Sequence, residues 1–183
     1  MAEQTDDLQL LAQFREEGTK EKAYTQIIKK YQEKLYWHIR RMVVSHEDAN
    51  DVLQNVFIKV WKSLANFRED SQLYTWLYRI ATNESLTYLE QQKKRASISI
   101  SDDESPLSNK LKAEKDYDGN KVQWKLQQAI QTLPDKQKAV FNLRYFEEMP
   151  YEEMSRVLET SEGALKASYH HAVKKIEDYI LNH

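Results

Sequence analysis

Side chains that could support catalysis or hold a metal are scattered along this sequence. Its three glycines lie far apart: Gly18, Gly119 and Gly163. Glycines at such spacing cannot form a phosphate-binding or dinucleotide-binding loop. His170 and His171 are neighbours, so on a helix they point to different sides, which is poor geometry for one metal ion. Asp102 and Asp103 lie in a polar stretch that offers no pocket to raise a pKa. We therefore expect no catalytic residue, no metal site and no cofactor.

Residues 66–95 instead combine side chains suited to binding. An apolar stripe recurs there at helical spacing: Leu73, Leu77, Ile80 and Ala81. Four other side chains fall off that stripe: Tyr74, Trp76, Asn83 and Thr87. Rings to stack on, an amide to read a base edge and the cations of residues 93–95 would together hold unstacked bases. A core helix with solvated lysines at its C-terminal end is the structural alternative, and this stretch alone leaves both open.

The composition predicts that these residues lie in an all-α protein. The chain has 183 residues with only 3 Gly and 3 Pro, few for a protein with many tight turns. It has no cysteine, which excludes disulfides and thiolate metal sites. No apolar run is long enough to cross a bilayer, and the N-terminus is acidic, unlike a signal peptide. We therefore expect a cytoplasmic protein with no membrane insertion.

Helical patterns fill the first half of the chain. They cover Asp6–Glu17, Lys20–Val44, a segment from Ser45 to Leu64, and the helix that follows the loop at 66–71. Ser45 and Ser71 are expected to cap the helices that follow them. The helix before Leu64 has a wide apolar arc, which leaves three polar residues on its remaining face: Asp51, Gln54 and Asn55.

Residues 96–120 break the helical pattern and mark a domain boundary. They are rich in Ser, Asp, Asn and Lys, and the alternation ASISIS indicates an extended linker. Helicity resumes at Val122–Thr132 and again after Pro134. A short helix, Tyr151–Leu158, a tight turn and a longer helix capped by Ser161 then follow. This order, with small and basic residues on the outer N-terminal face, predicts a helix-turn-helix whose second helix enters the major groove.

Two blocks of the sequence resemble the bacterial RNA polymerase sigma factors of the sigma-70 family, in their extracytoplasmic-function (ECF) group. Block 51–83, DVLQNVFIKVWKSLANFREDSQLYTWLYRIATN, is similar to region 2 of that family. Block 133–176, LPDKQKAVFNLRYFEEMPYEEMSRVLETSEGALKASYHHAVKKI, is similar to region 4. The resemblance implies a region 2 domain at 1–95, an acidic flexible linker at 96–120 and a region 4 domain at 121–183.

The resemblance also implies roles for individual residues. Docking on the clamp helices of core RNA polymerase is implied for Asp51, Gln54 and Asn55. Recognition and melting of the -10 promoter element are implied for Arg68, Ser71, Tyr74, Trp76, Arg79, Asn83 and Thr87. Asn83 stands where the family reads a flipped base. Recognition of the -35 element as duplex is implied for Ser161, Glu162, Ala164, Lys166, Ser168, His170, His171 and Lys174.

Several positions depart from the family pattern. Glu69 stands where relatives often carry glycine, so we expect a different loop shape and base preference. Asn55 stands where an acid is common, which would weaken polymerase docking. Ser168, His171 and Val173 stand where many relatives have arginine. Fewer cations release fewer counterions, so we expect the free protein to bind duplex DNA weakly.

The resemblance implies core RNA polymerase, through its clamp helices and flap, and promoter DNA as partners. Anti-sigma factors are common in the group, although no residue here demonstrates one. The nearest alternative function is a stand-alone helix-turn-helix regulator, which would bind a specific duplex without polymerase, usually as a dimer. A helical adaptor that binds only protein is a third.

Overall fold

The computed structural model describes residues 2–98 and 121–183, and its regular structure within these ranges is entirely helical, as the composition predicts. The elements are α1 (Ala2–Arg15), α2 (Lys20–Val43), α3 (His46–Ser63), the short 3₁₀ helix η1 (Leu64–Asn66), α4 (Leu73–Ile98), α6 (Lys121–Gln131), α7 (Asp135–Tyr145), α8 (Tyr151–Leu158) and α9 (Glu162–Asn182). Residues 99–120 of the predicted linker (96–120), which include Asp102, Asp103 and Gly119, lie outside the described residues.

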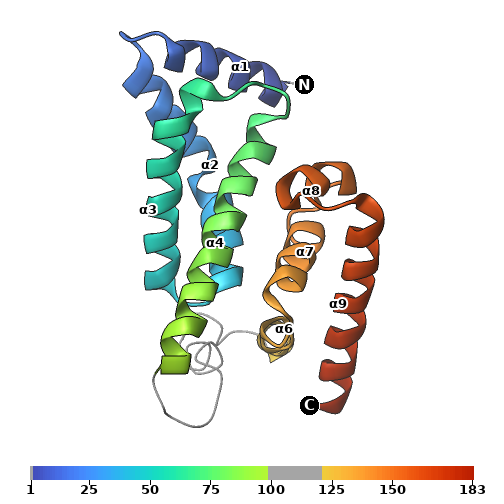
Figure 1. Cartoon of the computed structure of the whole chain (residues 1–183). Coiled ribbons are helices and arrows are strands. Elements are labelled where there is room, and N and C mark those ends of the chain that lie inside the picture. The colour runs from blue at the N-terminus through green and yellow to red at the C-terminus, as the bar shows by residue number, and fades with distance from the viewer. Residues whose placement is uncertain (1, 99–120) are drawn as a thin grey trace.

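The first domain is a bundle in which α2, α3 and α4 pack against one another and α1 crosses one end (Figure 1). The inner face of α2 is buried, because apolar side chains recur there every three or four residues. Its fully buried members include Ala23, Ile27, Leu35 and Ile39. Ser45 caps α3 as predicted: its hydroxyl accepts a hydrogen bond from the Asp48 backbone N–H at 3.3 Å.

Helix α4 differs from its prediction at both ends. It begins at Leu73, so Ser71 stands too early to be the N-cap, and its hydroxyl donates instead to the Gln72 carbonyl at 3.4 Å. At the other end the helix continues to Ile98, so Ala96–Ile98, predicted as extended linker, are helical. The first three residues of the ASISIS segment are therefore helical and not extended.

The second domain consists of α6, α7, α8 and α9. It has a small core of its own, formed by Ala129, Ile130, Leu133, Phe141, Ala172 and Ile176. The short helix α8 covers the predicted residues and ends in Glu159, whose left-handed backbone (φ 51°) turns the chain. Ser161 caps α9 as predicted, accepting from the Ala164 backbone N–H at 3.3 Å. The predicted helix-turn-helix is thus present.

The two domains pack against each other through α4 and α2 on one side and α7 and α8 on the other (Figure 1). One cluster of buried apolar side chains runs through both: Met42 and Val43 of α2 belong to it together with Leu143 and Met154 of the second domain. Helices α3 and α9 lie at opposite edges of the molecule, away from this contact.

Candidate nucleic-acid interface

Four of the predicted -10 contacts share one strip of α4: Trp76, Arg79, Asn83 and Thr87. With 3.6 residues per turn, their side chains project within an arc of about 80°. Asn83 and Thr87 are exposed, and Trp76 is half-buried with its ring centroid 5.1 Å from that of Phe67. The ring, the cation and the amide that base recognition requires therefore lie on one surface.

Tyr74 does not lie on this strip. Its ring packs against Tyr78 on another side of α4, with centroids 4.7 Å apart. Burial raises the pKa of Tyr74 to about 12, and the nearby carboxylates of Glu147 and Glu153 act in the same direction. The structure thus places Tyr74 in the contact with the second domain, apart from the other predicted -10 side chains.

The loop at residues 67–72 leads into the strip and carries the remaining two predicted contacts. Arg68 is exposed and Ser71 is half-buried. Glu69 has left-handed backbone, with φ 59°. The Arg15 guanidinium at the end of α1 contacts this loop twice: Nη1 lies 2.6 Å from Oε1 of Glu69, and Nη2 donates to the Phe67 carbonyl at 2.8 Å.

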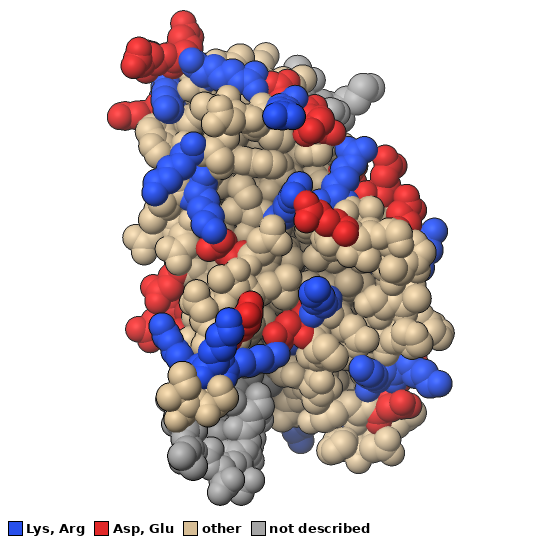
Figure 2. Space-filling view, in the orientation of Figure 1, with Lys and Arg blue, Asp and Glu red and all other residues tan. Residues whose placement is uncertain are grey.

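Acidic side chains of the second domain lie against the same side of α4. Glu159 pairs with Arg79, and Glu153 accepts a hydrogen bond from the Thr75 hydroxyl. A cavity of about 410 Å³ separates the loop and α4 from α8, and Trp76 and Arg156 are among its lining residues. Basic and acidic side chains meet along the boundary between the two domains in the space-filling view (Figure 2). The second domain therefore covers part of the candidate -10 surface.

Three more polar contacts hold the domains together. The Glu147 carboxylate accepts from Arg41 Nη1 at 2.9 Å and from the Tyr78 hydroxyl at 2.6 Å. Lys93 of α4 pairs with Asp135 of α7 at 2.6 Å. In each of these contacts the first domain supplies the hydrogen-bond donor and the second domain supplies the acid. The contact is therefore complementary in charge as well as in apolar surface.

The outer face of α3 is open to solvent. Asp51, Gln54 and Asn55 are exposed, as predicted, while Val52 and Val56 are buried beneath them. Ile58, one turn further along the same face, has 47% of its surface exposed. This face offers acidic, amide and apolar groups on a rigid helix, a mixture suited to docking a protein.

The outer face of α9 is also open. Most of its predicted contacts are exposed, namely Ser161, Glu162, Ala164, Lys166, His170, His171 and Lys174, whereas Ser168 is half-buried. Lys166 lies 3.9 Å from Glu162 and 5.6 Å from the centre of the Tyr151 ring. The side chains at the N-terminal end of α9 can therefore reach a groove without rearrangement of the helix-turn-helix.

Two other features, a metal-binding group and a membrane-spanning helix, are absent from the described parts of the chain. Residues 2–98 and 121–183 contain no group of three His, Cys, Asp or Glu side chains that could hold a metal ion. None of the helices in these two ranges combines the length and the hydrophobicity that a membrane crossing requires.

Comparison with known families decides what these surfaces belong to. A family model described as Sigma-70 region 2 matches residues 27–95, and one described as Sigma-70, region 4 matches residues 123–176. The chain belongs to the sigma-70 family. The RNA polymerase sigma-H factor of Pseudomonas aeruginosa is 32% identical to it over 97% of this chain and 95% of that protein. The ECF RNA polymerase sigma-E factor of Haemophilus influenzae is 32% identical over 98% of each. The chain is thus a sigma factor of the ECF group.

Solved structures confirm the fold of this sigma factor. CnrH, in complex with the cytosolic domain of CnrY, superposes with a TM-score of 0.68 at 21% identity, over 94% of this chain and 96% of that one. The sigma factor RpoE of Bartonella quintana, in complex with the anti-sigma factor NepR, gives a TM-score of 0.68 at 17% identity, over 87% of this chain and 97% of that one.

Family membership establishes the function at a general level. A sigma factor is a non-catalytic initiation factor, and this one directs promoter-specific initiation of transcription by RNA polymerase. The two relatives named above are sigma factors, which gives the alternative of a stand-alone helix-turn-helix regulator no support.

Sequence reasoning missed the residues of this sigma factor that act across the fold. Arg15 contacts a loop more than fifty positions away, and Glu153 and Glu159 meet α4 from the other domain. Helical periodicity reports only neighbours within one helix, so it carries no signal for these contacts. A local hint was Glu69, which we expected to change the shape of the loop and which has left-handed backbone.

Proposed function

We propose that the two domains divide promoter recognition between them. The first, residues 1–95, docks on core polymerase and recognises and melts the -10 element; the second, residues 121–183, reads the -35 element as duplex. Residues 99–120, between α4 and α6, link the two. The observation that supports this division is the exposure of two polar helix faces, on α3 and α9, at opposite edges of the molecule (Figure 1).

The α3 face is the proposed polymerase contact. Asp51, Gln54 and Asn55 would dock on the clamp helices, with Ile58 as an apolar side chain beside them. The flap of the polymerase is the proposed partner of the second domain. Because the sigma factor acts with RNA polymerase, we place it in the cytoplasm and assign it no enzymatic activity of its own.

The α4 strip is the proposed -10 site. Bases that leave the stack would find the Trp76 ring, the Asn83 amide and the Arg79 guanidinium on one surface, with Arg68 and Ser71 at its loop end and Thr87 beyond. Arg79 is held by Glu159 in the closed arrangement. The second domain must therefore leave α4 before the strip can bind a DNA strand.

The size of the promoter also requires this separation. A compact chain of 183 residues has a radius of gyration of about 16 Å. The two elements lie about 25 base pairs apart, which is roughly 85 Å of DNA at 3.4 Å per pair. The compact molecule is therefore too small to cover both elements, whereas the 22 residues between α4 and α6 let parted domains move as much as about 75 Å further apart. The domains can therefore reach both elements only after they part.

The stretch from Ser161, which caps α9, to Lys174 is the proposed -35 reader. Lys166, His170, His171 and Lys174 would contact base edges and phosphates, with Ser161, Glu162, Ala164 and Ser168 beside them. With two lysines on this face, the free protein should bind duplex DNA weakly and lose little affinity as salt rises. Polymerase would then supply most of the affinity for the promoter.

An anti-sigma factor is a further proposed partner. Of the two similar solved structures, one holds CnrH with the cytosolic domain of CnrY, and the other holds the sigma factor RpoE with the anti-sigma factor NepR. Co-purification of the chain from cells, followed by identification of bound proteins, tests whether such an inhibitor exists.

Promoter libraries test the residue assignments. Holoenzyme carrying Asn83→Ala should lose preference at one -10 position, and Lys166→Ala with His170→Ala should affect only -35 positions. A good contact to a base discriminates by about 1–3 kcal/mol, so each loss should be large enough to measure by sequencing the transcribed templates. Lys136→Ala, which removes an exposed cation elsewhere in the second domain, is the control. A wild-type sequence profile for Asn83→Ala would remove Asn83 from the site.

A further inference from the structure

The loop at residues 67–72 contains a residue in an unfavourable backbone conformation. Among the described residues, four other than glycine have positive φ: Val44, Glu69, Glu148 and Glu159. Val44 and Glu159 cap the ends of helices, and Glu148 follows the end of α7, where a left-handed residue commonly turns the chain. Glu69 caps no helix, because it lies between η1 and α4. Its conformation, which the Cβ atom disfavours, must therefore be held by its surroundings.

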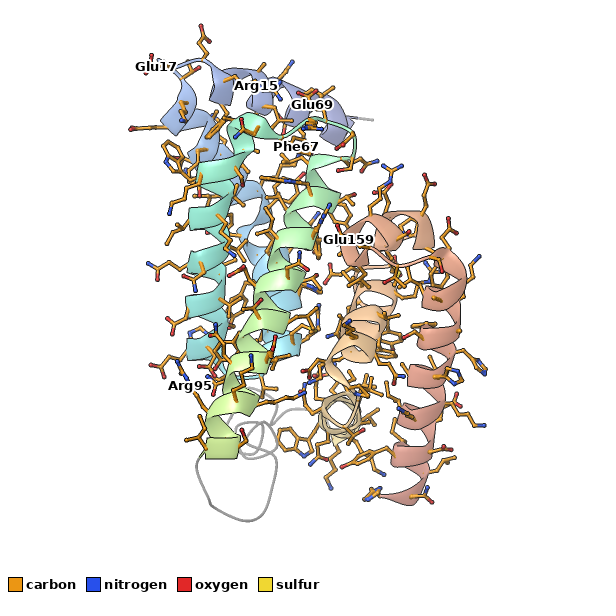
Figure 3. All side chains as sticks on the ribbon, in the orientation of Figure 1. Arg15, Glu17, Phe67, Glu69, Arg95 and Glu159 are labelled. Atoms are coloured by element: carbon orange, nitrogen blue, oxygen red, sulfur yellow. The ribbon has the colours of Figure 1, made fainter. Side chains whose placement is uncertain are left out.

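Arg15 holds this conformation. Its planar guanidinium reaches two acceptors of the loop at once, Oε1 of Glu69 at 2.6 Å and the Phe67 carbonyl oxygen at 2.8 Å. Figure 3 shows Arg15 of α1 beside both residues. A guanidinium suits this task because its donors lie in a fixed fork, whereas a lysine ammonium cannot hold two separated acceptors in the same geometry. The Arg15 side chain is 43% exposed and the Glu69 side chain 34% exposed. An ion pair this open to solvent contributes little to the stability of the fold, so its effect is to bias the conformation of the loop.

The position of Arg15 is itself fixed. It is the last residue of α1, where a cation suits the helix dipole. Leu10, Leu11 and Phe14 anchor α1 on the bundle, each at most 4% exposed, and the Phe14 ring meets Trp61 edge-on at 5.5 Å. Helix α1 can therefore act as a rigid support for the loop.

The loop transmits this restraint to the candidate -10 surface. Phe67 is buried and its ring packs against Trp76, the stacking ring of the strip. The loop also borders a cavity of about 370 Å³, which Leu8 and Leu11 of α1 line as well. The shape of the surface that meets unstacked bases therefore depends on where Arg15 holds Glu69.

We infer that Arg15 is a positioning residue for -10 recognition: by fixing the left-handed conformation of Glu69, α1 determines which bases the loop favours. This inference rests on the proposed -10 role of the loop. It assigns a function to a helix that lies outside the family match at residues 27–95. It also explains how this chain tolerates glutamate at a position suited to glycine, which adopts positive φ without support.

A double-mutant cycle in the full-length chain tests the inference. Arg15→Ala should reduce discrimination between the best and worst base at the loop-facing -10 positions at least fivefold in holoenzyme transcription, leaving the -35 profile and polymerase affinity unchanged. Arg15→Lys should rescue only part of this loss. In the Glu69→Gly background, Arg15→Ala should change discrimination less than twofold, because glycine no longer needs the support. Lys22→Ala, which removes an exposed cation of α2, should match wild type.

Hydrogen exchange in the free protein separates this inference from the proposed function. Arg15→Ala should speed amide exchange at residues 67–70 at least fivefold and leave α2 and α3 unchanged. Exchange like that of wild type would overturn the positioning role whether or not the chain supports transcription. Faster exchange with an unaltered -10 profile in active holoenzyme would overturn the specificity role. Absence of transcription from the wild-type chain would instead reject the proposed function.

Discussion

His38 is a fully buried histidine at the contact between α2 and α4. Its Nε2 lies 2.9 Å from the Thr82 hydroxyl, and its ring lies 5.2 Å from that of Tyr78. Burial lowers the pKa of His38 to about 3, and the positive charge of Arg41 acts in the same direction. Its Nδ1 has no hydrogen-bond partner among the described residues. The imidazole is therefore neutral in the folded protein at any pH near neutrality.

The depressed pKa of His38 predicts loss of stability in mild acid. An unfolded histidine gains a proton as the pH falls below about 6.5, whereas His38 in the folded state stays neutral until about 3. Between these pH values the unfolded state binds more protons than the folded state, so the free energy of unfolding decreases as the pH is lowered. We expect a loss of about 1 kcal/mol between pH 7 and pH 5.5, measured by urea unfolding.

The matched variants isolate this effect. His38→Leu has no titrating group at that site, so its stability should depend less on pH over the same interval. Replacing the exposed His171 by alanine should leave the wild-type slope unchanged. Equal pH slopes for wild type and His38→Leu would show that His38 does not carry the effect.

At the scale of elements, local pattern predicts helices well and their partners poorly. The bounds of α8 and the caps at Ser45 and Ser161 follow from neighbouring residues, and all three predictions are confirmed. Helix α4 is also buried on a side outside its apolar stripe. There Thr75 contacts α8 and Thr82 contacts α2. Polar residues satisfied by distant partners look solvent-exposed in a sequence, so their burial cannot be seen there.

Some features of the candidate surfaces could likewise be predicted from the sequence and others could not. The outer faces of α3 and α9 could be predicted because exposure follows from helical periodicity once the buried stripe is known. The displacement of Tyr74 from the -10 strip and the cover over Arg79 could not, because both depend on how two domains far apart in sequence meet.

The open face of α3 predicts the effect of a charge reversal. Asp51 is exposed, so Asp51→Arg should leave the thermal midpoint nearly unchanged. Charges across a docking surface are arranged to complement each other, so reversing one should lower affinity for core polymerase more than tenfold, measured by fluorescence anisotropy of the labelled chain. Glu33→Arg makes the same charge change on an exposed position of α2 and should bind normally. Unaltered affinity of Asp51→Arg would remove α3 from the interface.

At the scale of the whole molecule, the closed arrangement places acids of the second domain against the candidate -10 surface of α4. Glu153 and Glu159 approach α4 from the second domain, and Glu147 joins Arg41 to Tyr78. Carboxylates at these positions both hold the domains together and repel phosphates. The free sigma factor should therefore be a poor ligand for promoter DNA until polymerase separates its domains.

Removing two of these acids should expose the strip. We expect Glu153→Ala with Glu159→Ala to raise affinity for a labelled single-stranded -10 oligonucleotide at least fivefold, which is about 1 kcal/mol. Glu177→Ala with Asp178→Ala removes the same charge from the far part of α9 and should raise affinity less than twofold. Equal effects of the two pairs would mean that net charge, and not closure, limits binding.

The most direct test of the central claim adds the purified chain to core RNA polymerase on a promoter template. We expect the polymerase to open the -10 region, detected by permanganate reactivity of unpaired thymines, and to produce run-off RNA only when the chain is present. Binding of the chain to promoter duplex without polymerase, with neither strand opening nor RNA when polymerase is added, would contradict the account.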